Sequence, residues 1–179
     1  NTRERLCQIS KKYLNLITIK EPTKDYTYKT FFDMVSNISD QILLKKKNSI
    51  SAIIGEKDIL SYVSIFGVLK SGGTYIPISS NMPTKRIIKI ISKGKANIII
   101  CNSGKVKFYK KIFPKKIFFT EKNLSAKKNN YFLNPKKVNN LAYIIFTSGS
   151  TGEPKGVCIS RKSLDHYVKW LNTNFNIKK

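Results

Sequence analysis

The residues best suited to chemistry lie together between Thr147 and Gly156, where the sequence reads TSGSTGEPKG. Small residues there allow backbone N–H groups to turn inward and approach an anion closely. The hydroxyl side chains add hydrogen-bond donors, and the lysine adds a compact positive charge. This combination predicts a loop that holds a polyphosphate. The expected phosphate-binding residues are Thr147, Ser148, Gly149, Ser150, Thr151, Gly152 and Lys155.

The spacing within this loop excludes two common nucleotide-binding motifs. A Walker A loop needs Gly-Lys-Ser/Thr from the fifth residue after its first glycine. Here the fifth residue after Gly149 is Pro154, and Lys155 is followed by Gly156. The dinucleotide pattern Gly-x-Gly-x-x-Gly is also absent from this loop. A flexible Ser/Gly linker is the other alternative, and the ordered apolar flanks of the loop argue against it.

A short apolar strand, expected over Leu141–Phe146, leads into the loop, and a second apolar run follows it over Val157–Ser160. Ser160 is expected to cap a helix whose apolar face includes Leu164 and Leu171. His166 lies off that face and is expected to be exposed. Ligand is expected beyond the carboxyl end of the strand Leu141–Phe146, as in other open α/β sheets.

Strand and helix patterns alternate from about Ile50 onward, which predicts an α/β fold with a largely parallel sheet. The strands are apolar throughout, which is typical of strands buried on both faces. Segments 102–116 and 121–139 are expected to be irregular, and weak periodicity in residues 1–24 indicates a first helix. The expected strands are 50–54, 74–78, 97–101 and 117–119, and the expected helices begin near residues 31, 59, 84 and 160.

The loop resembles the phosphate-binding signature of the adenylate-forming ligases, which include adenylation domains of nonribosomal peptide synthetases, acyl-CoA synthetases and luciferases. A second segment, Leu69–Ile78, is similar to a Gly-Gly segment of the amino-acid-activating branch. Its expected role is structural, because Gly72-Gly73 would end a helix and turn the chain into a strand. Two positions depart from the family pattern. Ser79-Ser80 replaces an Asp-Pro pair, and Arg161 replaces a histidine often near the ligand, where it could still meet phosphate or carboxylate.

The resemblance implies that ATP and a carboxylic acid, in this branch an amino acid, form an acyl-adenylate and pyrophosphate. It also implies Mg²⁺ with ATP, and transfer of the acyl group to phosphopantetheine on a carrier-protein domain. The resemblance spans about Tyr26 to Trp170. Residues 1–179 are therefore expected to form a partial N-terminal adenylation domain. The family's acyl pocket, metal-binding acid and C-terminal lid domain are expected to be absent, so the chain would hold no catalytic or metal-binding residue.

Three alternatives remain at this point: a D-alanine-carrier-protein ligase, an inactive remnant or nucleotide-binding module, and a nucleic-acid-binding protein. The net charge of +24 favours the last. However, only four of the 34 basic residues are arginines, the residue that nucleic-acid surfaces usually favour. Lysine runs such as Lys45–Lys47 lie between apolar segments, where solvated loops belong. The residue types therefore argue against nucleic acid as a partner.

Cysteine and histidine usage exclude several other mechanisms. The three cysteines have no metal or redox spacing, and Cys101 and Cys158 are expected to be buried. A single histidine, His166, leaves little material for a Ser-His-Asp or zinc site. No apolar run is long enough to cross a bilayer and no signal pattern appears, so a cytoplasmic location is expected.

Overall fold

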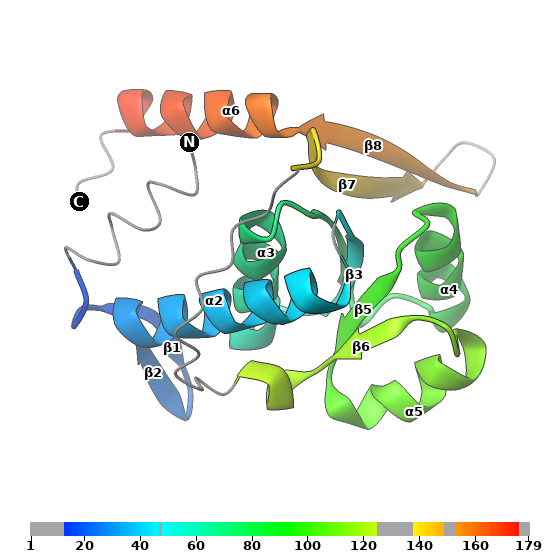
Figure 1. Cartoon of the computed structure of the whole chain (residues 1–179). Helices are drawn as coiled ribbons and strands as arrows, with labels where there is room; N and C mark the ends of the chain where they lie inside the picture. Colours follow the sequence, from blue (N-terminus) through cyan, green and yellow to red (C-terminus); the bar gives the residue numbers. More distant parts are fainter. Residues whose placement is uncertain (1–12, 47, 125–137, 149–152, 176–179) are drawn as a thin grey trace.

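The computed structural model describes residues 13–46, 48–124, 138–148 and 153–175. They form a six-stranded sheet in the order β6-β5-β3-β4-β7-β8, beside a small two-stranded sheet of β1 and β2 (Figure 1). The strands are β1 (Ile17–Glu21), β2 (Lys24–Thr27), β3 (Ile50–Gly55), β4 (Thr74–Ser79), β5 (Ile98–Cys101), β6 (Ile117–Phe119), β7 (Leu141–Ser148) and β8 (Pro154–Ser160). The helices are α2 (Tyr28–Lys45), α3 (Ile59–Lys70), α4 (Thr84–Lys93), α5 (Ser103–Ile112), the 3-10 turn η1 (Glu121–Leu124) and α6 (Arg161–Asn174).

The large sheet is parallel from β6 to β7, and only the pair β7–β8 is antiparallel. Alternate residues of its central strands face two separate apolar cores. Ile53 of β3 packs in one core with α2 and α3, whereas Ile54 packs in the other with α4 and Tyr109 of α5. In Figure 1, α2 and α3 lie on one side of the central strands β3 and β5, and α4 and α5 lie on the other. This arrangement confirms the predicted α/β fold with a largely parallel sheet. Burial on both faces holds for β3 and β5, whereas β7 and β8 keep several residues exposed.

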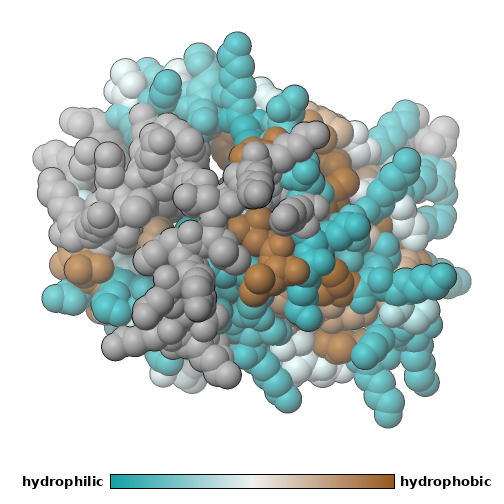
Figure 2. Space-filling view, in the orientation of Figure 1, coloured by the Kyte–Doolittle hydropathy of each residue, from teal (hydrophilic) through white to brown (hydrophobic). Residues whose placement is uncertain are grey.

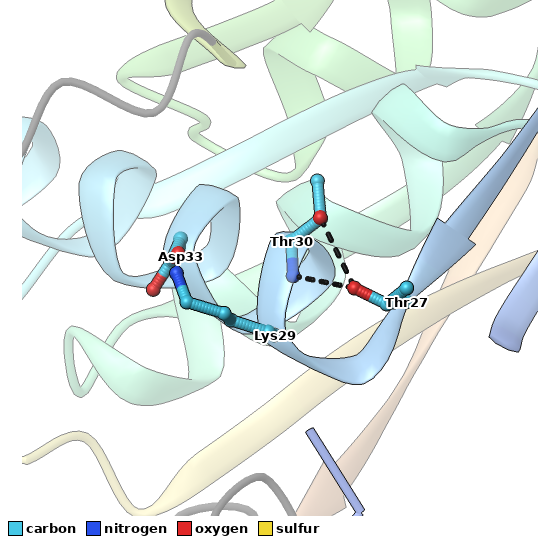
Figure 3. Close-up of polar contacts among 4 residues, drawn as sticks. All are labelled: Thr27, Lys29, Thr30 and Asp33. Atoms are coloured by element: carbon cyan, nitrogen blue, oxygen red, sulfur yellow. Dashed lines mark hydrogen bonds and ion pairs between the residues drawn. The ribbon is translucent and has the colours of Figure 1, made fainter. Parts of the chain in front are cut away.

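Side-chain caps set the beginnings of several helices. The Thr27 hydroxyl accepts a hydrogen bond from the backbone N–H of Thr30 at 3.2 Å, and Lys29 pairs with Asp33 one turn along α2 at 2.8 Å (Figure 3). The hydroxyl of Ser160 accepts from Ser163 N at 3.0 Å, which confirms the predicted cap of α6.

Three expectations from the sequence were wrong. Part of the segment expected to be irregular is helix α5, which buries only Tyr109 and therefore shows little periodicity. Within the weakly periodic N-terminal segment, Ile17–Glu21 is a strand that pairs with β2; residues 1–12 lie outside the described part of the chain. Cys158 is exposed on β8, an edge strand, whereas Cys101 is buried as expected.

Helix α6 differs from the other long helices because none of its residues is buried. Tyr167 and Trp170 stack with ring centroids 6.1 Å apart and are about half exposed. His166 is exposed, as predicted. Figure 2 shows hydrophilic side chains over much of the visible surface, with smaller hydrophobic patches between them. In the described ranges, no helix has both the length and the apolar character needed to cross a membrane.

Candidate functional site

The three predicted phosphate-binding residues that the structure describes lie at the tip of the hairpin formed by β7 and β8. Thr147 and Ser148 end β7, and Lys155 is the second residue of β8. The register of the hairpin places Lys155 opposite Thr147. Gly149, Ser150, Thr151 and Gly152 lie outside the described residues.

The assignment of Pro154–Gly156 to a loop was wrong, because these residues begin strand β8. Their pairing with Phe146–Ser148 extends the hairpin beyond the apolar runs on which the prediction was based. Residues directly opposite each other in an antiparallel pair project to the same face. Thr147 and Lys155 therefore present a hydroxyl and an ammonium group together, and both residues are exposed. This pair can donate hydrogen bonds and positive charge to an oxyanion.

The base of the hairpin is attached to β4. Strands β4 and β7 pair at Tyr75 and Tyr143, whose rings stack with centroids 5.2 Å apart. The hydroxyl of Thr74 donates to Leu141 O at 3.0 Å, beside this pair. Burial raises the pKa of Tyr75 to about 12, so its phenol stays neutral and packs as part of the interface.

The Gly-Gly segment before β4 has a structural role, as predicted. Gly72 has a φ of 79°, a conformation that a side chain disfavours, immediately after the C-cap of α3. A Cβ atom on Gly73 would lie 2.9 Å from Ser49 O, which is closer than packing allows. These two glycines let the chain turn from α3 into β4 against the neighbouring backbone.

Arg161 lies at the base of the hairpin and not at its tip. Its Nε donates to Asn139 O at 2.8 Å, and its two terminal nitrogens donate to Leu69 O and Gly73 O. Burial lowers the pKa of Arg161, and the charge of Asp165 partly opposes this shift. Strand β8 runs from the tip to Ser160, directly before Arg161, so Arg161 lies at the other end of the strand from Lys155, and the expectation that it meets the ligand stays a prediction. The guanidinium joins three backbone segments.

The turn at Ser79-Ser80, where the family pattern has an Asp-Pro pair, is stabilised by another residue. One carboxylate oxygen of Glu56 accepts hydrogen bonds from Ser79 Oγ, Ser80 N and Ser80 Oγ, each at 2.8 Å. These bonds lower the pKa of Glu56. The turn that follows β4 is thus held by a carboxylate from the end of β3, and not by an aspartate within the turn. Glu56 carried no signal in the sequence for this contact.

Sequence reasoning also missed three charged residues beside the tip. Glu153, directly before β8, forms ion pairs with Lys89 and Lys93 of α4 at 2.7 and 2.9 Å. Hydrogen bonds from Lys89 and then from Lys93, together with their charges, lower the pKa of Glu153 to about 2. The only sequence signal was the four-residue spacing of two lysines on a polar helix face.

The described residues contain no group of three or more His, Cys, Asp or Glu side chains that could hold a metal ion. Thr147, Ser148 and Lys155, by contrast, share one end of the hairpin. The arrangement is therefore suited to binding an anion by hydrogen bonds and positive charge. The expectation that the chain holds no catalytic residue stays a prediction.

Comparison with known proteins gives a consistent result. The family model described as AMP-binding enzyme matches residues 8–178. The chain is 30% identical to a D-alanine–D-alanyl carrier protein ligase of Lactococcus lactis over 96% of its own length and 35% of that protein. It is 29% identical to gramicidin S synthase 1 of Brevibacillus brevis over 95% of its own length and 16% of that protein.

A solved structure shares the fold. ATP-bound MatB from Rhodopseudomonas palustris superposes with a TM-score of 0.84 at 17% identity, over 99% of this chain and 38% of that one. The predicted architecture is thus found in a protein of low sequence identity, and the chain spans well under half the length of each of these proteins.

Proposed function

Because the chain belongs to the AMP-binding enzyme family of adenylate-forming ligases, we propose that its hairpin binds the β- and γ-phosphates of ATP. In this proposal the ATP activates a carboxylic acid, specifically an amino acid, as an acyl-adenylate with release of pyrophosphate. The observation that carries the proposal is the pairing of Thr147 with Lys155 at the exposed tip of the hairpin. Ser148, the last residue of β7, adds a second exposed hydroxyl at the end of the strand.

Each described residue of the tip has a specific role in this mechanism. The hydroxyls of Thr147 and Ser148 donate hydrogen bonds to phosphate oxygens. The ammonium group of Lys155 offsets the negative charge that grows on pyrophosphate as the substrate carboxylate attacks the α-phosphorus. These residues contribute positioning and charge stabilisation, with no proton transfer or covalent step of their own. Gly149, Ser150, Thr151 and Gly152 complete the set in the proposal.

Mg²⁺ would accompany ATP as the counter-ion of its phosphates, and we assign it no ligand among the described residues. The acyl acceptor we propose is phosphopantetheine on a carrier-protein domain. The family membership and the name of the Lactococcus relative support this choice. The assignment of residues 1–179 to part of an N-terminal adenylation domain is a proposal of the same kind. We also propose that adenylation is carried out by a longer protein, because this chain covers only 35% and 16% of the lengths of the two relatives.

A D-alanine-carrier-protein ligase is the second candidate, and the 30% identity over nearly the whole chain favours it. The two candidates share the phosphate-binding step and differ in the amino acid and its carrier. An amino-acid panel in an adenylation assay of the full-length protein would separate them, since the D-alanine ligase would turn over D-alanine selectively.

The phosphate-binding step is tested by calorimetric titration with Mg·ATP at moderate salt. Lys155→Ala should abolish saturable binding, whereas Lys162→Ala, a change at an exposed lysine of α6, should leave it intact. Equal effects of the two variants would show that general positive charge, and not the hairpin, attracts the nucleotide.

A further inference from the structure

The carboxylate of Glu153 is held by two cations from another element. Lys89 Nζ lies 2.7 Å from one oxygen, and Lys93 Nζ lies 2.9 Å from the other. The same Lys93 ammonium group also reaches Pro154 O at 3.4 Å. These contacts tie the start of β8 to α4 across more than sixty residues of sequence.

The packing of α4 places both lysines where they can make these contacts. Ile87, Ile90 and Ile91 are buried against the sheet, so positions 89 and 93 fall together on the opposite side, one turn apart. At the end of α4, a Cβ atom on Gly94 would overlap the Ile76 side chain at 2.3 Å and would lie 3.4 Å from the Phe146 ring of β7. The helix end therefore lies close to the hairpin.

The buried ring of Pro154 joins these ion pairs to the phosphate-binding tip. Glu153 precedes this proline and Lys155 follows it, so the chain is fixed at two consecutive positions before it presents the lysine. A restraint on Glu153 thereby restrains the direction of Lys155. Such ion pairs between exposed side chains contribute little to global stability. Their effect should therefore be local.

The ion pairs with Lys89 and Lys93 also neutralise the negative charge of Glu153. A carboxylate beside a phosphate-binding tip repels the ligand unless it is neutralised, because like charges at close range oppose binding. Two lysines around one carboxylate leave this cluster with a net positive charge. Glu153 can therefore lie next to the phosphate-binding tip without giving this part of the surface a net negative charge.

We propose that Lys89, Lys93 and Glu153 form a latch in which α4 positions the phosphate-binding tip and neutralises its one carboxylate. The three are positioning residues, acting through Lys155. The inference rests on the proposed function for its effect on ATP, whereas its effect on the hairpin itself is independent of any ligand.

The first test measures the hairpin without ligand. Hydrogen exchange at the backbone amides of β8 should be several-fold faster in the Lys89→Met/Lys93→Met double variant, while exchange in β3 and β5 stays unchanged. The matched control is Lys85→Met/Lys162→Met, which removes the same charge from two other exposed positions. Unchanged exchange in β8, or equal acceleration in the control, would overturn the latch whatever the protein does with ATP.

The second test measures Mg·ATP affinity in the same variants. The Lys89→Met/Lys93→Met variant should bind about tenfold more weakly than the control, a factor expected when an anionic ligand meets an unpaired carboxylate. Adding Glu153→Gln to this double variant should recover part of the affinity, because it removes the repulsion. No difference from the control, or no recovery, would contradict the proposed role. If wild type itself fails to bind Mg·ATP, the proposed function fails and hydrogen exchange alone decides the latch.

Discussion

Replacing Arg161 with methionine should lower the free energy of unfolding by about 2–4 kcal/mol, because the guanidinium holds three backbone carbonyls at the base of the hairpin. A hydrogen bond to a charged donor contributes about 1.5–3 kcal/mol. Leu69 O also accepts a hydrogen bond from Gly72 N at 3.2 Å, so loss of its bond to Arg161 should cost less free energy. The bonds to Asn139 O and Gly73 O therefore account for most of the effect. Removing the desolvated charge offsets part of it.

The assay is urea unfolding followed by circular dichroism, with the slope of the transition checked for constancy. Methionine keeps the length and apolar volume of the arginine stem, so the change reports mainly on the lost hydrogen bonds. Arg161→Lys should lose about half as much, since one ammonium group cannot span three carbonyls that surround a planar fork. The neighbouring Lys162→Met is the control and should change stability by less than about 0.5 kcal/mol.

A loss below about 0.5 kcal/mol for Arg161→Met would refute this reasoning, because it would mean that water or a neighbouring group replaces the guanidinium without cost. Full stability of Arg161→Met combined with weaker Mg·ATP binding would be a more specific contradiction. It would favour the expectation that Arg161 meets the ligand.

Three further predictions concern the glycine turn, the latch and the thiols. Gly73→Ala should destabilise the protein by about 1–3 kcal/mol in the same unfolding assay, because its Cβ would press on Ser49 O; an unchanged midpoint would contradict this. The pKa of Glu153, about 2, lies below the ordinary value of about 4.3, so its contribution to stability is complete above that ordinary value and is lost as pH falls towards 2; a carboxyl NMR titration with a midpoint near 4.3 would exclude the ion pairs. In the folded protein Cys158 should react with a thiol reagent, whereas Cys101, whose pKa burial raises to about 11, should react only after unfolding.

Local pattern was sufficient to predict most of the sheet. The apolar runs at Ile50–Gly55 and Ile98–Cys101 are strands because their side chains are needed in both cores, and this requirement is visible in the sequence itself. Helix α5 was missed because it buries only Tyr109, so its residues need no apolar period. The first residues of strand β8 were assigned to the loop because they are stabilised by pairing with β7 and carry no apolar pattern.

The contacts that position the site could not be predicted because their partners are distant or lack a side-chain signal. Arg161 bonds to backbone carbonyls, including that of Leu69, and every residue type carries such a group. Glu153 meets lysines of α4 that resemble the many other solvated lysines of the chain. The proposed phosphate-binding residues could be selected from the sequence because their chemistry is concentrated in one stretch, whereas the residues that contact the hairpin are spread over the fold.

Binding of ATP phosphates at the hairpin can be tested by following backbone amide resonances during a titration with Mg·ATP. We expect saturable shifts concentrated at Thr147, Ser148, Lys155 and Gly156, with little change at Arg161 and the base of the hairpin. Shifts spread over the lysine-rich surface and removed by moderate salt, or saturable shifts confined to other elements, would contradict the claim that this hairpin binds the phosphates of ATP.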